Sequence, residues 1–424
     1  MAGNSDTLKI LDVLLSAEIF NQNLNLDIND LTPDHRVMFG LGSPSGIKRP
    51  VTVSESTIRR VLHIDDPRAK VAHNPVVIYE EFGQRFRIPA LEAAANWFIK
   101  NGGLPDIKKN PALAYYFENF DASGVSYSSV RAANPPFEDS KAYLEGKISE
   151  ILAADERLRA AMDLVIINAP EEIDQQMTDL VCSPEQLDTI RKMDIAIKHR
   201  DFLLKHRIHE VGKLLFVGPP GTGKTSLALA MSHAMHTPII EVRLSMVTSQ
   251  YLGETSKNID KIFEFAKKLA PCILFIDEFD YVAKSRVTDD HGAMKRAVNS
   301  LLKNIDKINL VKFGVLLIGA TNHPQLLDEA AWRRFDEVVE FSLPNEEMRE
   351  EILKKVTASV GCECDFRYLA AQTDGLSGSD IRMVVKEATL TAIIGDRRTL
   401  SQSDIEKGIE IIRGRGTIRR LNWL

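Results

Sequence analysis

One eight-residue segment, residues 218–225, constrains the fold of this chain more than any other part of its sequence. It reads Gly-Pro-Pro-Gly-Thr-Gly-Lys-Thr and fits the phosphate-binding pattern G-x-x-x-x-G-K-[ST]. An apolar run at residues 214–217 precedes it, and a run with helical spacing at residues 226–231 follows it. Such a phosphate site requires a loop between a buried strand and a helix. We therefore predict that the chain binds a nucleoside triphosphate.

The residues of this loop have separate tasks. Glycine lets the backbone bend so that its N–H groups converge on phosphate oxygens, and the positive helix N-terminus adds to the attraction. Lys224 can reach the β- and γ-phosphates, and the Thr225 hydroxyl can ligate Mg²⁺. The predicted nucleotide-binding residues of the loop are Gly218, Pro219, Pro220, Gly221, Thr222, Gly223, Lys224, Thr225 and Ser226.

A second apolar run, further along the chain, ends in two carboxylates. Residues 272–276 read Cys-Ile-Leu-Phe-Ile and suit a buried parallel strand, after which Asp277 and Glu278 follow. Asp277 would hold the Mg²⁺ shell and bind the nucleotide through it, and Glu278 would orient and polarise the attacking water. An acidic pair can also cap a helix. Its position after a phosphate loop favours hydrolysis over binding alone.

Composition and charge bound the class of protein. The chain has 424 residues, enough for two or three domains, and its net charge of −6 argues against a nucleic-acid surface spread over the whole protein. No apolar run approaches the ~20 residues that span a bilayer, and no signal peptide is apparent. Cys182, Cys272, Cys362 and Cys364 lack zinc-site spacing, so we expect reduced thiols in a cytoplasmic protein.

The pattern of elements predicts four regions. They are an N-terminal, mostly helical domain at residues 1–135, a helical linker at 136–174, a large subdomain at 175–344, and a helical lid with its tail at 345–424. Helices are predicted over residues 8–20, 89–101, 110–120, 137–154, 155–167 and 184–206, and strands over 51–53, 76–79, 213–217, 238–244, 272–276, 314–319 and 336–341. Alternating strands and helices predict an α/β fold, a P-loop parallel sheet with helices on both faces.

The order of motifs over residues 175–413 resembles the AAA family of ring-forming ATPases, within the wider AAA+ group. Residues 316–322, Leu-Leu-Ile-Gly-Ala-Thr-Asn, resemble its sensor strand, which implies that Asn322 lies beside the attacking water. Residues 375–381, Gly-Leu-Ser-Gly-Ser-Asp-Ile, resemble its lid motif, in which Gly378 permits close packing near the nucleotide base. An ordinary turn and a simple helix start are the plain alternatives.

A pair of arginines resembles the arginine fingers of the same family. Residues 328–336 read Asp-Glu-Ala-Ala-Trp-Arg-Arg-Phe-Asp, which implies that Arg333 and Arg334 enter the neighbouring subunit's nucleotide site. Arginine suits this task because its planar fork stays charged and can contact two oxygens. Which of the two contributes more stays open, and a pair of surface salt bridges is the alternative.

A segment after the second strand resembles the family's pore loop. Residues 249–254 read Ser-Gln-Tyr-Leu-Gly-Glu, so that Tyr251, Leu252 and Gly253 would grip an extended polypeptide non-specifically. Burial of the first two in the core is the alternative. The polar stretch at residues 284–291 would then be a second pore loop or an ordinary solvated loop.

The resemblance implies a cytoplasmic ATPase that uses ATP and Mg²⁺ and forms a homo-oligomeric ring, expected to be a hexamer. It would remodel, unfold or disassemble a protein substrate by threading it through the pore, with residues 1–170 recruiting the substrate or an adaptor. We expect no membrane span and no nucleic-acid partner. A nucleic-acid-dependent motor of the clamp-loader type and an ATP-controlled assembly scaffold stay open as alternatives, the first because of the basic tail at residues 413–420.

Within the family, two subfamilies are disfavoured by the sequence. Residues 209–212, His-Glu-Val-Gly, lack the zinc motif of the membrane-anchored AAA proteases. No heptad array of the kind found in proteasomal ATPases is present. The chain is more similar to katanin- and spastin-like remodelling enzymes, without an assigned subfamily.

Overall fold

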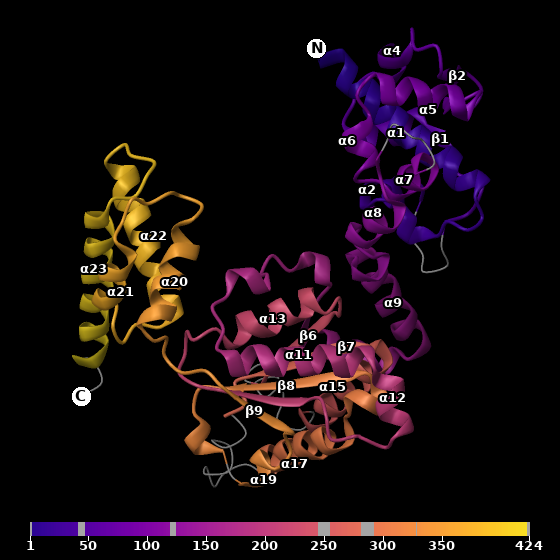
Figure 1. Cartoon of the computed structure of the whole chain (residues 1–424). Helices are drawn as coiled ribbons and strands as arrows, with labels where there is room; N and C mark the ends of the chain where they lie inside the picture. Colours follow the sequence, from indigo (N-terminus) through magenta and orange to yellow (C-terminus); the bar gives the residue numbers. More distant parts are fainter. Residues whose placement is uncertain are drawn as a thin grey trace. The chain divides into compact units, whose positions relative to one another are not determined.

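The computed structural model describes residues 2–40, 47–118, 124–244, 255–280, 292–327 and 329–421. The chain forms two compact units, Met1–Ser149 and Glu150–Leu424 (Figure 1). Among the described residues, no helix combines the length and the apolar character that a membrane span requires.

The first unit is mainly helical, as predicted. Its helices are α1 (Ala2–Gln22), α2 (Pro33–Met38), α3 (Glu55–Leu62), α4 (Pro67–Val71), α5 (Leu91–Lys100), α6 (Leu104–Ile107), α7 (Pro111–Phe117), α8 (Tyr127–Ala133) and α9 (Lys141–Ala154), which continues into the second unit. Strands β1 (Val53–Ser54), β3 (Arg85–Arg87) and β2 (Ile78–Glu80) form a small antiparallel sheet in that order. Helix α1 packs against α5 and α7, and its apolar residues Ile10, Leu11, Leu15 and Ile19 are fully buried there.

A buried polar cluster joins three helices of this unit. Asn110, which caps α7, donates from Nδ2 to Asp12 Oδ1 at 2.8 Å and to Ser16 Oγ at 2.7 Å. His35 of α2 lies with Nε2 3.4 Å from Asp12 Oδ2, and its Nδ1 is 2.7 Å from the Thr32 hydroxyl. Burial raises the pKa of Asp12 to about 7 and lowers the pKa of His35 to about 4. The pair therefore favours its neutral forms, which cost less to bury than two charges.

The second unit contains a six-stranded sheet in the order β4-β6-β7-β8-β5-β9. Its strands are β4 (Val165–Asn168), β5 (Lys213–Val217), β6 (Ile239–Arg243), β7 (Cys272–Asp277), β8 (Val315–Thr321) and β9 (Glu337–Glu340). All five predicted parallel strands are present, and the ladders among β5 to β9 are parallel. Their near-continuous apolar runs, such as the buried residues of β7 and β8, are typical of strands covered on both faces.

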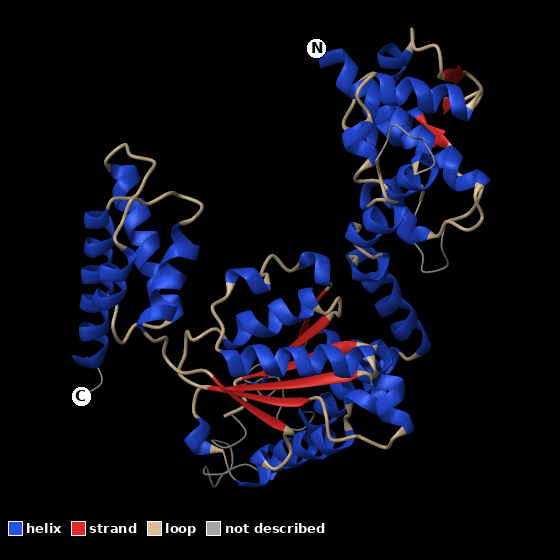
Figure 2. Ribbon diagram, viewed as in Figure 1, coloured by secondary structure: helices blue, strands red, loops and turns tan. Residues whose placement is uncertain are grey.

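Helices lie on both sides of this sheet, as predicted (Figure 2). They are α10 (Arg159–Met162), α11 (Pro184–Lys198), α12 (Arg200–Lys205), α13 (Lys224–Ala234), α15 (Thr255–Leu269), α17 (Gly292–Lys307), α18 (Leu310–Phe313) and α19 (Glu329–Trp332). Apolar residues of α11 and α13 share one core with β5, β7 and β8.

Two predicted helices in this unit are wrong in part. The helix predicted over residues 155–167 is wrong beyond Met162, where α10 ends. Residues 165–168 form β4, which pairs antiparallel with β6. Val165, Ile166 and Ile167 are β-branched and suit an edge strand. The helix predicted over residues 184–206 is divided at His199 into α11 and α12, and Arg200, the first residue of α12, donates to the carbonyls of Val311 and Lys312 in α18.

Four helices form the C-terminal lid. They are α20 (Glu346–Thr357), α21 (Phe366–Gln372), α22 (Gly378–Ile394) and α23 (Gln402–Leu421), with a core of their own. Arg349 is buried and donates to the carbonyls of Pro344 and Ala370, both at 3.0 Å, so it ties the start of the lid to α21.

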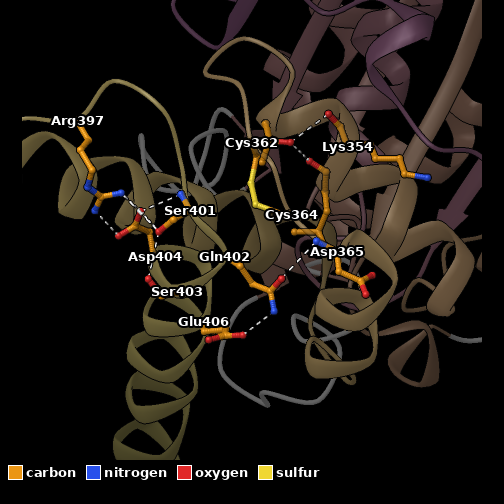
Figure 3. The surroundings of a disulfide bond; sticks show 12 residues. Lys354, Cys362, Cys364, Asp365, Arg397, Ser401, Gln402, Ser403, Asp404 and Glu406 are labelled. Atoms are coloured by element: carbon orange, nitrogen blue, oxygen red, sulfur yellow. Dashed lines mark hydrogen bonds and ion pairs between the residues drawn. A yellow bond between two sulfur atoms is a disulfide. The ribbon is translucent and has the colours of Figure 1, made fainter.

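A disulfide corrects the prediction for the cysteines. Cys362 and Cys364 are bonded in the segment between α20 and α21, where Asp365 N–H donates to Gln402 Oε1 at 3.4 Å (Figure 3). An extended segment brings the two Cα atoms to 5.5 Å, within the ordinary range for a disulfide. The expectation of reduced thiols is therefore wrong for this pair, whereas Cys182 and Cys272 are free thiols.

Candidate active site

The predicted phosphate loop joins β5 to α13 at the carboxyl end of the sheet. Gly221 and Gly223 have φ of 79° and 100°, in the left-handed region that favours glycine, and Gly223 immediately precedes the first residue of α13. The loop is anchored to the neighbouring strand because Gly218 N–H donates to the carbonyl of Thr321, the last residue of β8, at 3.3 Å. Ligands bind at this edge of a parallel sheet in open α/β folds.

Lys224 is held inside the loop. Its side chain is only 7% exposed, and its Nζ donates to the carbonyls of Gly218 and Pro219, both at 2.8 Å. Burial lowers the pKa of Lys224 to about 8, against the opposing effect of the Asp277 and Asp280 carboxylates. The ammonium is thus poorly solvated, which strengthens its attraction to an incoming phosphate.

The oxygen donors predicted for Mg²⁺ lie together. The Thr225 hydroxyl donates to Asp277 Oδ2 at 3.5 Å, and the other carboxylate oxygen of Asp277 accepts from Glu278 N–H at 2.8 Å. Hydroxyl and carboxylate oxygens are hard ligands of the kind that Mg²⁺ takes in phosphate sites. The two side chains fit this cation, which would neutralise charge on the β- and γ-phosphates.

Glu278 has an unusual backbone. Its φ of 55° lies in the left-handed region, which costs a non-glycine residue about 1–3 kcal/mol and is concentrated at active sites. The side chain is exposed and does not line the nucleotide cavity, although it directly follows Asp277, which does. Glu278 is thus adjacent in the chain to a residue of the cavity lining, and its predicted role, to orient and polarise the attacking water, stays a prediction.

A cavity of about 330 Å³ lies over the loop, between the large subdomain and the lid. Among the predicted residues, Pro220 to Ser226, Asp277, Asn322 and Gly378 line it. Gly218 and Pro219 lie behind them as acceptors for Lys224. The lid closes against the loop because Ser379 N–H donates to the carbonyl of Gly221 at 3.0 Å.

Sequence reasoning did not assign several residues that line this cavity. They are Asp179, Leu180 and Val181 before α11, Ile352, Lys355 and Val356 on α20, and Ser379 and Arg382 on α22. The motif at residues 375–381 pointed to α22, and residues 346–356 resemble the first lid helix of the family, but neither resemblance singled out these side chains. No local pattern marked residues 179–181.

The two predicted finger residues lie elsewhere. Arg333 and Arg334 line a second cavity of about 440 Å³ with Glu210, Lys213, Asp306 and Asp336. Arg334 Nε lies 3.1 Å from a carboxylate oxygen of Asp306, and Arg333 pairs with Glu329. Neither arginine is among the described residues that line the nucleotide cavity of this subunit.

The predicted pore residues Tyr251, Leu252 and Gly253 lie outside the described residues, as does the second predicted loop at residues 284–291. Their roles remain predictions.

A phosphate loop on a parallel sheet, an acidic strand end beside it and a helical lid over the cavity define a P-loop nucleotide hydrolase. The family model described as "ATPase family associated with various cellular activities (AAA)" matches residues 214–343, and the AAA+ lid domain matches residues 363–407. An uncharacterized AAA family ATPase, y4kL, of Sinorhizobium fredii is 36% identical over 252 residues, which are 59% of this chain and 74% of that protein. The chain belongs to the AAA family of ATPases and hydrolyses ATP with Mg²⁺.

Other relatives match the same part of the chain. A proteasome-activating nucleotidase of Thermococcus onnurineus is 35% identical, over 54% of this chain and 59% of its own length. A spastin of Ixodes scapularis is 34% identical, over 62% of this chain and 41% of its own length. The crystal structure of the FIGL-1 AAA domain has a TM-score of 0.52 and 25% identity, covering 61% of this chain and 89% of that chain. Since the matches include both a proteasome-activating nucleotidase and a spastin, no subfamily is assigned.

Proposed function

We propose that this ATPase works as a ring of identical subunits that remodels a protein substrate. One observation carries the proposal: Arg333 and Arg334 line a cavity separate from their own subunit's nucleotide cavity. A guanidinium stabilises the charge that develops on the γ-phosphoryl group only when it reaches that group. If these arginines serve hydrolysis, they therefore do so in another subunit.

The exposure of Arg333 agrees with action on a partner, whereas the Arg334 side chain is 25% exposed. The Arg333 side chain is 74% exposed, and its carboxylate partner Glu329 is 77% exposed. An ion pair of this kind is worth only about 0–1 kcal/mol. A phosphate of a neighbouring subunit could therefore replace the carboxylate at little cost.

The kind of work is proposed from the relatives and from the unassigned first unit. One relative carries the name proteasome-activating nucleotidase and another the name spastin. Their matches cover 54% and 62% of this chain. Both AAA matches begin after residue 213. Residues 1–149 form a compact unit of their own outside these matches. We assign to it the recruitment of a protein substrate or adaptor, and we propose threading by Tyr251 and a cytoplasmic location.

The experiment compares Glu278→Gln with the double variant Glu278→Gln/Tyr251→Ala, each loaded with ATP and used to capture proteins from native lysate. We expect Glu278→Gln to retain substrates because it binds ATP without completing hydrolysis, and the double variant to lose them. A single variant Tyr251→Ala should keep ATPase activity within about twofold, since the role that we propose for Tyr251 is contact with substrate and not with nucleotide.

Other outcomes favour the alternative functions. Equal capture by both variants argues against threading and favours a nucleotide-controlled scaffold, for which Tyr251 is dispensable. Stimulation of the ATPase by DNA or RNA that weakens steeply with salt favours a nucleic-acid motor.

A further inference from the structure

Thr321, the last residue of β8, lies where three loops of the nucleotide site meet. Its side chain is 1% exposed, and its hydroxyl donates to Asp280 Oδ1 at 3.2 Å. The same hydroxyl oxygen accepts from His323 N–H at 3.0 Å. A hydroxyl has one proton, so the bond to Asp280 uses it and the bond from His323 uses a lone pair.

The backbone on either side of this hydroxyl extends the contacts. The Thr321 carbonyl accepts from Gly218 N–H at 3.3 Å, at the start of the phosphate loop. The preceding carbonyl, of Ala320, accepts from Phe279 N–H at 2.8 Å, within the acidic segment after β7. One short stretch of β8 thus contacts the phosphate loop, the acidic segment and the turn that presents Asn322.

Asp280 is the second member of this arrangement. It is 5% exposed, and it follows Asp277 and Glu278 by three and two positions in the chain. It is also close enough to Lys224 for its charge to favour the protonated ammonium. A buried carboxylate is costly unless hydrogen bonds satisfy it, and Thr321 supplies one.

We propose that Thr321 and Asp280 act as a positioning pair for ATP hydrolysis, which sets Asn322 relative to Asp277 and the phosphate loop. Neither side chain lines the nucleotide cavity, so the pair acts through its neighbours. The hydroxyl holds the turn at residues 321–323 through His323, and Asn322 lies between these two residues. Because a small displacement at a reacting centre slows chemistry strongly, the pair should govern the catalytic rate more than ATP affinity.

The proposal concerns ATP hydrolysis and does not depend on protein remodelling, since it is tested with ATP alone on the full chain. Thr321→Val keeps the shape of the side chain and removes the hydroxyl. We expect kcat to fall about ten- to hundredfold, with KM for ATP within about twofold, because the cavity lining is intact. Thr321→Ser keeps the hydroxyl and should restore most of kcat.

A matched control separates positioning from general loss of a buried hydroxyl. Thr237 is 4% exposed and its hydroxyl donates to the Met235 carbonyl at 2.9 Å, away from the nucleotide cavity. Thr237→Val should lower the melting temperature with kcat nearly unchanged. If Thr321→Val behaves in the same way, Thr321 has a structural role only and the proposal is wrong.

A double-mutant cycle tests the pair itself. Asp280→Ala removes the acceptor, so Thr321→Val should add little to its effect on kcat. Asp280→Asn keeps an acceptor oxygen and provides a second route if Asp280→Ala does not fold. If Thr321→Val lowers kcat by the same factor in the wild-type and the Asp280-substituted chains, the two residues act independently and the proposed pair does not exist.

Discussion

The cavity at the phosphate loop is lined by glycines, apolar residues and charged residues from both subdomains, whereas the described residues that line the cavity around Arg333 and Arg334 are all charged. In the first, a lysine with a lowered pKa, two oxygen donors for Mg²⁺ and a closing lid converge on one space. In the second, each arginine is held by a carboxylate of its own chain.

The difference shows which part of the chemistry one subunit can supply alone. ATP can bind with the residues of a single chain because they surround one cavity. The two arginines have no phosphate site of their own chain beside them among the described residues, so we propose that they act on a neighbour's ATP. ATP binding and ATP hydrolysis should therefore depend on different sets of residues. Substitutions in each cavity test this separation.

Lys224→Ala should have the largest effect. It removes the buried ammonium from the phosphate loop, and we expect ATP binding to be lost at concentrations that saturate the wild type. Binding is measured by calorimetry, with Lys198→Ala as the control, since Lys198 pairs with Asp194 on the surface of α11. Unchanged ATP affinity for Lys224→Ala would mean that the cavity is not the nucleotide site.

Arg334→Ala should leave ATP binding intact and lower kcat about a thousandfold, the scale of an arginine that stabilises the transferring phosphoryl group. Arg333→Ala should act in the same direction, and the ratio of the two effects identifies the principal residue. Steady-state ATPase assays measure kcat, and calorimetry checks binding. A large loss of ATP affinity would place the arginine in its own subunit's site and contradict the separation of the two cavities.

Glu278→Gln should lower kcat about a hundredfold or more, because an amide cannot take the proton of the attacking water. ATP affinity should stay within about threefold, since Glu278 does not line the cavity. Glu264→Gln, at an exposed position of α15, is the control. A hydrolysis rate near that of the wild type would remove Glu278 from the mechanism.

The pH dependence of ATP binding should be the smallest effect. Burial lowers the pKa of Lys224 to about 8 in the free protein, whereas phosphate favours the charged form. Above pH 8 the free lysine loses its proton and must regain it on binding, so affinity should fall by up to about tenfold per pH unit. Below pH 8 the free lysine is already protonated, so its titration should add no pH dependence to the affinity for ATP.

Lys224→Arg provides the matched comparison for that titration, since a guanidinium stays protonated throughout. Its affinity for ATP should therefore change little between pH 7 and pH 9.5. If the wild type and Lys224→Arg lose affinity in parallel, Lys224 does not titrate in this range.

The central part of the fold could be predicted from the sequence because its signals are local. The phosphate-loop motif joins the end of β5 to Lys224, Asp277 is the last residue of β7, and Asn322 directly follows β8. Since the strands are parallel neighbours, their carboxyl ends meet and the three residues come to one cavity.

What could not be predicted depends on tertiary partners. Strand β4 is a short apolar run, and the spacing of its apolar residues fits a helix as well as a strand. Its conformation depends on pairing with β6, which the local sequence does not reveal. Lys355 and Arg382 look like ordinary exposed helix residues until the lid closes over the loop. Thr321 lies within the motif at residues 316–322 and Asp280 lies two residues beyond the acidic pair, but their contact requires the register of β7 against β8.

A mixing experiment between Lys224→Ala and Arg334→Ala tests the separation of the two cavities most directly. Each variant alone should be inactive, one because it does not bind ATP and the other because it lacks the arginine. In mixed assemblies, intact Lys224 sites can face intact arginines of neighbouring subunits, so ATPase activity should reappear and peak near equal proportions. No activity at any proportion, with mixed assemblies verified by tagged co-purification, would contradict action of Arg334 in a neighbouring subunit.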